Sequence, residues 1–282
     1  METKLSCRDA RITVSTSGHT VMIGERINPT GKKKLAAALR EGDMSVVRQE
    51  ALAQKAAGAG ILDVNVVTEG VDEVELLPRV IEAILDIVTI PLCIDINNPR
   101  ALKRALELYP GKPLVNSVSA EKKSLEEVLP LVAEYKTAVI GLTIDDDGIP
   151  KTAEKRLEIA CRIVEQAASL GISREDIIID PLALALGSDH MAASMTLKAI
   201  EMIHRELGVN QTLGASNVSF GLPNRIEVNK AFLPLAIRAG VTCPTVDPIR
   251  VGATIAAADL ILGRDRFSMR YITDYRKRDQ TG

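Results

Sequence analysis

The sequence predicts a (β/α)8 barrel with a short N-terminal β-hairpin. Eight times along the chain, a short apolar run ends in a polar residue, and helical sequence separates nearly every run from the next. Strand followed by helix, repeated eight times over roughly 250 residues, is the pattern of a (β/α)8 barrel. Aromatic residues make up only 2% of the chain, so aliphatic side chains must build the core, as they do inside a parallel barrel.

The predicted strands follow one another in order along the chain. Residues 10–23 alternate around Ser17–Gly18 and are predicted to form a hairpin, whose second arm becomes the first barrel strand. The strands and their polar ends are Val21–Gly24 into Glu25–Arg26, Ile61–Leu62 into Asp63–Asn65, Pro91–Ile94 into Asp95, Pro113–Val115 into Asn116, Ala138–Leu142 into Thr143, Ile177–Ile179 into Asp180, Leu213–Ala215 into Ser216–Asn217 and Val241–Val246 into Asp247.

Helices are predicted between these strands from their apolar periodicity. The clearest is 71–88, whose apolar positions 74, 77, 81, 84, 85 and 88 lie on one helical face. The remaining predicted helices are 35–40, 45–57, 98–108, 123–135, 151–170, 192–207, 226–239 and 249–263. No Pro/Gly/Ser-rich linker interrupts this series, so we expect a single domain over 1–282.

Composition excludes several classes of partner. The formal net charge of −2 and the scarcity of aromatic residues argue against nucleic-acid binding. The apolar stretches are shorter than the ~20 residues needed to cross a bilayer, and the first ten residues lack the apolar core of a signal peptide. We therefore expect a soluble, cytoplasmic protein. The four cysteines are scattered and only three histidines occur, so no metal site is predicted from either residue type.

The polar strand ends should converge on one pocket, because a barrel of this kind carries its catalytic groups at the C-terminal ends of the strands. Asp180 and Asp247 each precede a proline, which holds the aspartate in an extended conformation at its strand end. Helix capping is the alternative role for such an aspartate, but it explains one polar strand end better than eight.

The residues at these strand ends suit the recognition of a flat heterocycle. They are rich in carboxylates and amides and poor in pairs of nucleophile and base. A carboxylate accepts two parallel N–H bonds, and an amide offers a donor beside an acceptor. Magnesium binding by the same aspartates is the main alternative, since Mg²⁺ prefers oxygen ligands.

Five segments, each at a strand end, resemble the pterin-binding methyltransferases. They are GERINPTGKKK at 24–34, CIDINN at 93–98, LVNS at 114–117, IIIDPL at 177–182 and GASNVSFGLPNR at 214–225. This family includes the methyltetrahydrofolate:corrinoid protein methyltransferases, the tetrahydrofolate methyltransferases of corrinoid-dependent demethylation systems and the folate domain of cobalamin-dependent methionine synthase. The resemblance covers about 21–263.

The resemblance implies a role for each matched residue. Asp95, Asn116 and Asp180 would hold the pterin ring, and Asn217 would hydrogen-bond N5, the nitrogen that bears the methyl group. Gly214 would permit close approach of the ring, and Arg225 would contact the substrate. Four neighbouring residues could position these ligand-contacting residues without touching the ligand, or could be purely structural: Glu25, Asn28, Asp63 and Asn65.

The resemblance also implies partners. Tetrahydrofolate or 5-methyltetrahydrofolate would be the substrate, and a corrinoid would be the other methyl carrier. The D-x-H-x-x-G pattern of a corrinoid-binding module is absent, because the sequence after Asp189–His190 does not continue it. The corrinoid would therefore arrive on a separate protein that docks over the mouth of the barrel. The family's barrels usually pair, so we expect a homodimer, with contacts from 192–207 and 226–239.

Two other functions remain open. Dihydropteroate synthase has the same barrel and pterin-binding aspartates, but its loops differ from RINPTGKKK and SNVSFGLPNR. A non-catalytic pterin-binding subunit that serves as a docking platform is the second alternative. Asn217 argues against that subunit, because binding alone has no use for a contact to N5.

Overall fold

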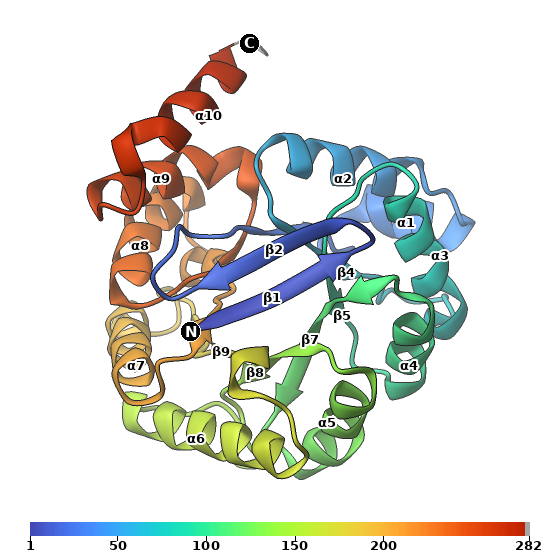
Figure 1. Cartoon of the computed structure of the whole chain (residues 1–282), viewed down its shortest axis with the longest axis horizontal. Helices are drawn as coiled ribbons and strands as arrows, with labels where there is room; N and C mark the ends of the chain where they lie inside the picture. Colours follow the sequence, from blue (N-terminus) through green and yellow to red (C-terminus); the bar gives the residue numbers. More distant parts are fainter. Residues whose placement is uncertain (280–282) are drawn as a thin grey trace.

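The structure is a computed structural model and describes residues 1–279. Eight parallel strands lie in the order β10-β9-β8-β7-β5-β4-β3-β11, and an isolated parallel bridge between Gly214 and Thr245 joins the two ends of this sheet. The barrel strands are β3 (Ile23–Ile27), β4 (Ile61–Asn65), β5 (Leu92–Asp95), β7 (Leu114–Ser119), β8 (Ala138–Leu142), β9 (Ile177–Asp180), β10 (Asn210–Gln211) and β11 (Thr245–Val246). The predicted (β/α)8 barrel is confirmed (Figure 1).

Helices surround the barrel and alternate with its strands (Figure 1). The α-helices are α1 (Lys33–Glu41), α2 (Ser45–Ala56), α3 (Glu73–Leu85), α4 (Pro99–Leu108), α5 (Lys122–Tyr135), α6 (Ala153–Ser169), α7 (Ala192–Leu207), α8 (Arg225–Ala239), α9 (Pro248–Ile261) and α10 (Met269–Asp279). The short 3-10 helices are η1 (Arg174–Asp176), η2 (Ala215–Ser219) and η3 (Arg266–Ser268). Side-chain caps define several starts: Asp72 accepts from Val74 N, and Asn98 accepts from Arg100 N.

The N-terminal hairpin exists, but its predicted position is wrong. It pairs β1 (Glu2–Cys7) with β2 (Ala10–Ser15), and its turn lies at Arg8–Asp9 rather than at Ser17–Gly18. The side chains of β1 alternate between exposed and buried, which is the pattern of a strand with one covered face. After β2 the chain turns at Ser15–Gly18, where the Gly18 N–H donates to the Ser15 carbonyl, but the returning segment is not paired with β2 in the described structure. Instead, the backbone N–H of Val21 donates to the carbonyl of Thr242 as the chain enters the barrel.

This hairpin covers the N-terminal end of the barrel. Leu5 and Val14 are buried in one cluster with Ile23, Ile61 and Leu114, which lie at or near the starts of barrel strands. Strand β1 also pairs with the two-residue strand β6 (Gly111–Lys112), which directly precedes β7. Figure 1 shows the hairpin lying across the barrel. Polar strand ends therefore lie at the opposite, open end.

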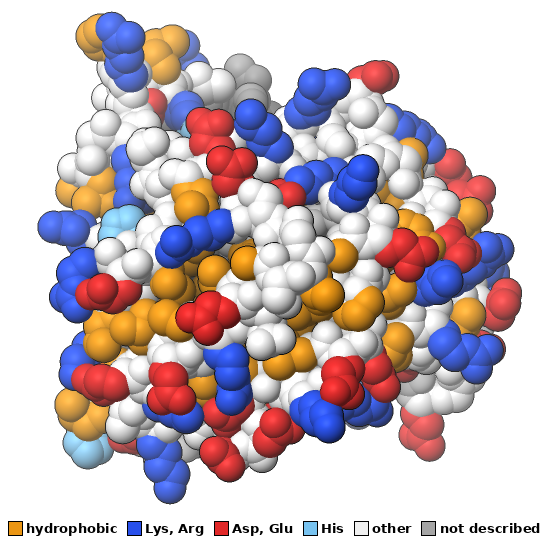
Figure 2. All heavy atoms as spheres, turned by 60° about the horizontal axis from the view of Figure 1, so that its bottom comes forward, with side chains coloured by type: hydrophobic (Ala, Val, Ile, Leu, Met, Phe, Trp, Pro, Cys, Tyr) orange, Lys and Arg blue, Asp and Glu red, His pale blue; other side chains and the backbone are white. Residues whose placement is uncertain are grey.

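The surface carries charges of both signs. In Figure 2, Lys and Arg side chains are interspersed with Asp and Glu over the visible face, and hydrophobic side chains form a broken band between them. That face therefore presents no extended field of one sign. Among residues 1–279, no helix has the length and apolar character that a membrane span requires.

Candidate functional site

Neighbouring strands bring four of the predicted side chains together. Asn65 lies beside Asp95, and Asp95 beside Asn116, in the register of β4, β5 and β7. The Nδ2 of Asn65 donates to Oδ2 of Asp95 at 2.9 Å, and the Nδ2 of Asn116 donates to Oδ1 of Asp63 at 3.2 Å. Two amides thus each donate a hydrogen bond to one oxygen of a carboxylate. Asp63 also has a hydrogen bond with Cys93, whereas the second oxygen of Asp95 accepts no hydrogen bond from the described residues.

Burial raises the pKa of the carboxylates in this group. Asp63 is only 3% exposed, and burial, followed by the negative charge of Asp95, raises its pKa. Burial also raises the pKa of Asp95, although the hydrogen bond from Asn65 lowers it in part. A ligand that offers N–H donors to these oxygens would favour their ionised form and offset the cost of their burial.

Asp180 supplies a third carboxylate from β9, which is separated from β7 by the single strand β8. It ends β9, and its Oδ1 accepts from the backbone N–H of Leu182 at 2.8 Å, which closes a turn across Pro181. Burial raises the pKa of Asp180 to about 6, while backbone hydrogen bonds from Leu182 and Gly214 and the positive charge of Arg156 oppose that rise.

Arg156, on α6, stabilises this turn by hydrogen bonds to its backbone, and the sequence analysis did not single out this residue. Its Nη1 donates to the carbonyls of Pro181 and Leu182, both at 2.9 Å, and it is fully buried. Its Nε and Nη2 have no hydrogen-bond partner among residues 1–279. A signal for it exists in the sequence, because Arg156 lies on the buried face of α6 between Ala153 and Ala160.

Replacing Arg156 by methionine should lower the free energy of unfolding by about 1–3 kcal/mol, because two buried carbonyls lose their donor. The side chain keeps similar length, so packing is largely retained. The loss of positive charge should also raise the pKa of Asp180 above about 6. Urea denaturation and titration of the Asp180 carboxyl by NMR measure both effects. Arg156→Lys, which keeps the charge, is the control and should shift this pKa less.

A second group of predicted residues surrounds η2. Ser216 donates its hydroxyl to both carboxylate oxygens of Glu25, at 2.8 and 3.1 Å. Burial raises the pKa of Glu25, and the Ser216 bond lowers it. Asn217 is exposed, and no hydrogen bond of its side chain occurs among the described residues. Gly214 leaves it room, since a Cβ at 214 would lie 3.2 Å from the Asn217 Nδ2.

Arg225 holds the turn that carries Asn217. It begins α8, its Nε donates to the Ser219 hydroxyl at 3.1 Å, and its Nη2 donates to the Ser216 carbonyl at 2.7 Å. The guanidinium also lies 5.7 Å from the centre of the Phe220 ring. Asn28, in contrast, is not joined to either group by a hydrogen bond of its side chain, because its Oδ1 accepts from Thr30 N in a local turn.

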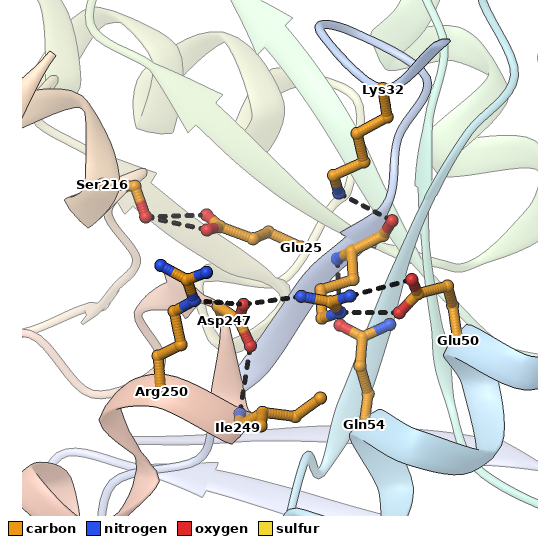
Figure 3. Close-up of polar contacts among 9 residues, drawn as sticks. Glu25, Lys32, Glu50, Gln54, Ser216, Asp247, Ile249 and Arg250 are labelled. Carbon is orange, nitrogen blue, oxygen red and sulfur yellow. Dashed lines mark hydrogen bonds and ion pairs between the residues drawn. The ribbon is translucent and has the colours of Figure 1, made fainter. Parts of the chain in front are cut away.

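An ion-pair network fixes the end of β3 beside this group, as Figure 3 shows. Arg26 donates to both oxygens of Glu50, at 2.6 and 2.8 Å, and to Asp247 at 2.8 Å. Its hydrogen bonds to Glu50 raise the pKa of Arg26 further. Lys32 donates to the Arg26 carbonyl at 2.8 Å, and Asp247 also caps α9 through Ile249 N. Asp247 therefore serves the capping role that was the alternative for it. Within residues 1–279, no cluster of three or more His, Cys, Asp or Glu side chains is arranged to hold a metal ion.

The structure is thus a (β/α)8 barrel with buried carboxylates and amides at the C-terminal ends of its strands. Residues 24–247 match the pterin binding enzyme family, and the chain belongs to that family. It is 35% identical over 267 residues to the methylcorrinoid:tetrahydrofolate methyltransferase of Eubacterium limosum, and the alignment covers 91% of this chain and 96% of that protein. It is 30% identical over 263 residues to methionine synthase of Mycobacterium tuberculosis, covering 89% of this chain and 22% of that protein.

Solved structures with the same fold include dihydropteroate synthases. The enzyme from Xanthomonas albilineans, determined with 4-aminobenzoic acid, superimposes with a TM-score of 0.69 over 95% of this chain and 99% of that one. Their sequences are 21% identical, so this likeness concerns the fold alone. A dihydropteroate synthase of Yersinia pestis gives the same TM-score at 16% identity.

Proposed function

We propose that this chain is a methyltransferase that moves a methyl group between N5 of tetrahydrofolate and the cobalt of a corrinoid on a separate protein. The observation that carries the proposal is the 35% identity, over nearly the whole of both chains, to the methylcorrinoid:tetrahydrofolate methyltransferase. The carboxylates and amides at the open end of the barrel support it independently, because they suit the edge of a pterin.

In this proposal Asp95, Asn116 and Asp180 hold the pterin. Its N3–H and 2-amino group form two adjacent donors, which match the two oxygens of a carboxylate. Asp95 and Asp180 end β5 and β9, and Asn116 lies on β7. Asn65 and Asp63 hold Asp95 and Asn116 through the hydrogen bonds described above. Asn65 and Asp63 would then act by positioning the residues that touch the ligand.

Asn217 would act on N5. When the methyl group leaves N5, electron density builds on that nitrogen, and an amide N–H directed at it stabilises the charge in the transition state. In the reverse direction the same contact is made as N5 attacks the methyl group. The exposed side chain of Asn217 and the space left by Gly214 allow the amide to rotate with the developing charge.

The corrinoid would supply or accept the methyl group at the open end of the barrel when its carrier protein docks there. This end is opposite the N-terminal hairpin and carries Asn217. The contribution of this chain is to bind folate, orient N5 toward the opening and stabilise its charge.

Calorimetric titration with tetrahydrofolate and 5-methyltetrahydrofolate tests folate binding. Methyl transfer is then tested with two free probes: cob(I)alamin, kept reduced by an added reductant, to accept the methyl group of 5-methyltetrahydrofolate, and methylcobalamin to donate one to tetrahydrofolate. We expect both folates to bind and the methyl group to move between N5 and cobalamin, as followed by the cobalamin spectrum. Absence of folate binding would contradict the pterin assignment. Folate binding without transfer to cobalamin or to any corrinoid protein would favour the non-catalytic docking subunit.

We also propose a homodimer formed through α7 and α8. Leu235 on α8 is 56% exposed, and Met191, which precedes α7, is 50% exposed. A stable dimer of this kind buries roughly 1,200–2,000 Å² in total. Light scattering at micromolar concentration should give twice the 30.4 kDa mass of the chain. Leu235→Glu should shift the protein toward monomer, and a wild-type monomer would contradict the prediction.

A further inference from the structure

Leu182 has a backbone conformation that leucine rarely adopts. Its φ is +66°, in the left-handed region, where the Cβ of an L-residue lies too close to the following carbonyl oxygen. Other left-handed residues have a local reason for this conformation: Arg8 lies in the hairpin turn, and Lys136 is the C-cap of α5. Leu182 lies outside any helix or strand, two residues after the end of β9, so neither a helix end nor a hairpin turn requires it.

Three hydrogen bonds hold Leu182 in this conformation. Its backbone N–H donates to Oδ1 of Asp180 at 2.8 Å, and its carbonyl accepts from Nη1 of Arg156 at 2.9 Å and from Oγ1 of Thr196 at 3.0 Å. Nη1 of Arg156 also donates to the Thr196 hydroxyl at 3.2 Å, and both residues are fully buried, on α6 and α7. A strained conformation persists only where its surroundings fix it. The fold therefore imposes this conformation.

The side chain of Leu182 does not join the apolar core. It is half-buried and, within residues 1–279, neither belongs to a core cluster nor packs against one. Its neighbours behave differently, because Ala183 belongs to a buried cluster and Leu186 packs against the same cluster. Core packing therefore does not offset the strain at Leu182.

We propose that Leu182 is a binding residue whose side chain forms an apolar wall against one face of the bound pterin ring. The inference rests on the proposed function and deepens it. Asp95, Asn116 and Asp180 would fix the edge of the ring, and Leu182 would fix its plane. Strained residues gather at ligand sites, where the strain places a group that an ordinary conformation would direct elsewhere.

The position of Leu182 beside Asp180 supports this role. The hydrogen bond of 2.8 Å from its N–H ties its backbone to the carboxylate that would receive the N–H groups of the ring. Hydrogen bonds at the edge of a flat ligand leave both of its faces without contacts. Binding sites therefore line those faces mainly with apolar side chains and use a few polar groups for orientation.

The scarcity of aromatic residues also favours a leucine in this place. The chain has no Trp, four Tyr and three Phe. Among residues 1–279, Phe220 is the one aromatic residue on a loop at the open end of the barrel, and it lies at the end of η2, 5.7 Å from the Arg225 guanidinium. Contact with the ring beside Asp180 is thus left to an aliphatic side chain.

Calorimetry with 6-methyltetrahydropterin, which contains the ring without the rest of folate, tests the contact directly. Leu182→Ala keeps the Cβ, and with it the strain, but removes most of the side chain. It should weaken binding about three- to tenfold, the loss expected when roughly half of a leucine side chain is no longer buried by the ligand. Leu182→Met restores the apolar volume and should keep the affinity within about twofold of wild type. Tetrahydrofolate should show the same changes.

Leu182→Gly separates the contact from the strain. Glycine adopts a positive φ freely, and the relief of strain should at least balance its higher entropy in the unfolded chain. We therefore expect an unchanged or higher urea midpoint together with the loss of affinity seen in Leu182→Ala. Lys136→Gly is the matched control, because Lys136 has a φ of +51°, is exposed and lies just before the start of β8. It should keep or raise the midpoint and leave both affinities unchanged.

The outcomes separate this inference from the proposed function. If the wild-type protein binds neither ligand, both fail. If it binds both ligands and Leu182→Ala retains the wild-type affinities, the pterin assignment stands and Leu182 is not a ligand contact. A fall in the urea midpoint of Leu182→Gly that parallels its loss of affinity would show that the side chain is structural. Weaker binding in Leu182→Ala, retained binding in Leu182→Met and undiminished stability in Leu182→Gly support the inference.

Discussion

Asn217→Ala is expected to lower the single-turnover rate of methyl transfer about 10²–10³-fold while changing folate affinity much less. The reason is that an interaction made only as charge develops on N5 contributes to the transition state and not to the ground state. Rapid mixing measures the rate: protein loaded with 5-methyltetrahydrofolate is mixed with cob(I)alamin, or protein loaded with tetrahydrofolate is mixed with methylcobalamin. Calorimetry measures the affinity.

A purely structural role for Asn217 predicts a different pattern, in which stability, binding and turnover fall together. Asp72→Ala provides the comparison, because it removes a helix cap at the start of α3 and should cost about 1 kcal/mol of stability without slowing transfer. If Asn217→Ala retains the wild-type single-turnover rate, the residue is structural and the proposed mechanism is wrong.

Asp180→Asn and Asp95→Asn should each weaken folate binding by about 1.5–3 kcal/mol, or roughly 10- to 150-fold, because an amide cannot replace a charged acceptor for two N–H groups. Folate affinity of the wild-type protein should also rise as pH increases through about 6, since the pKa of Asp180 is raised to about 6 and binding needs its ionised form. Titrations between pH 5 and 8 measure this, and Asp180→Asn should flatten the rise.

The same substitutions should not weaken folding in the absence of folate. A raised pKa means that folded Asp180 holds its proton more tightly than the unfolded chain does, so its stabilising contribution is present below about pH 4 and is lost as pH rises through about 6. At pH 8, Asp180→Asn removes a buried charge and should keep or raise the free energy of unfolding. Unchanged folate affinity in both variants would contradict the pterin site.

The residues at the strand ends were predictable because the C-terminal ends of all parallel strands lie at the same end of a barrel. Asp95, Asn116 and Asp180 follow buried runs, and in the structure they end or lie on β5, β7 and β9. Helix positions followed from apolar periodicity, and 192–207 matches α7 residue for residue. Alternation within 2–7 was the missed signal for the hairpin, whose turn needs only Arg8 in the left-handed region.

Contacts between distant residues were not predictable from local pattern. The pairing of Arg26 with Glu50 joins β3 to α2, and Arg156 reaches from α6 to the turn after β9. The sequence thus predicted which side chains lie at strand ends. Their hydrogen-bond and ion-pair partners could be identified only from the tertiary structure.

The hairpin at the N-terminal end has a consequence for the sequence of events in catalysis. Leu5 and Val14 close that end, so a ligand enters the barrel only through the face to which a corrinoid protein would dock. Folate and the corrinoid protein would both use the open end of the barrel, so they cannot enter or leave it at the same time. Folate would have to enter before the carrier protein arrives and leave after it departs, which makes the kinetic scheme a compulsory-order one.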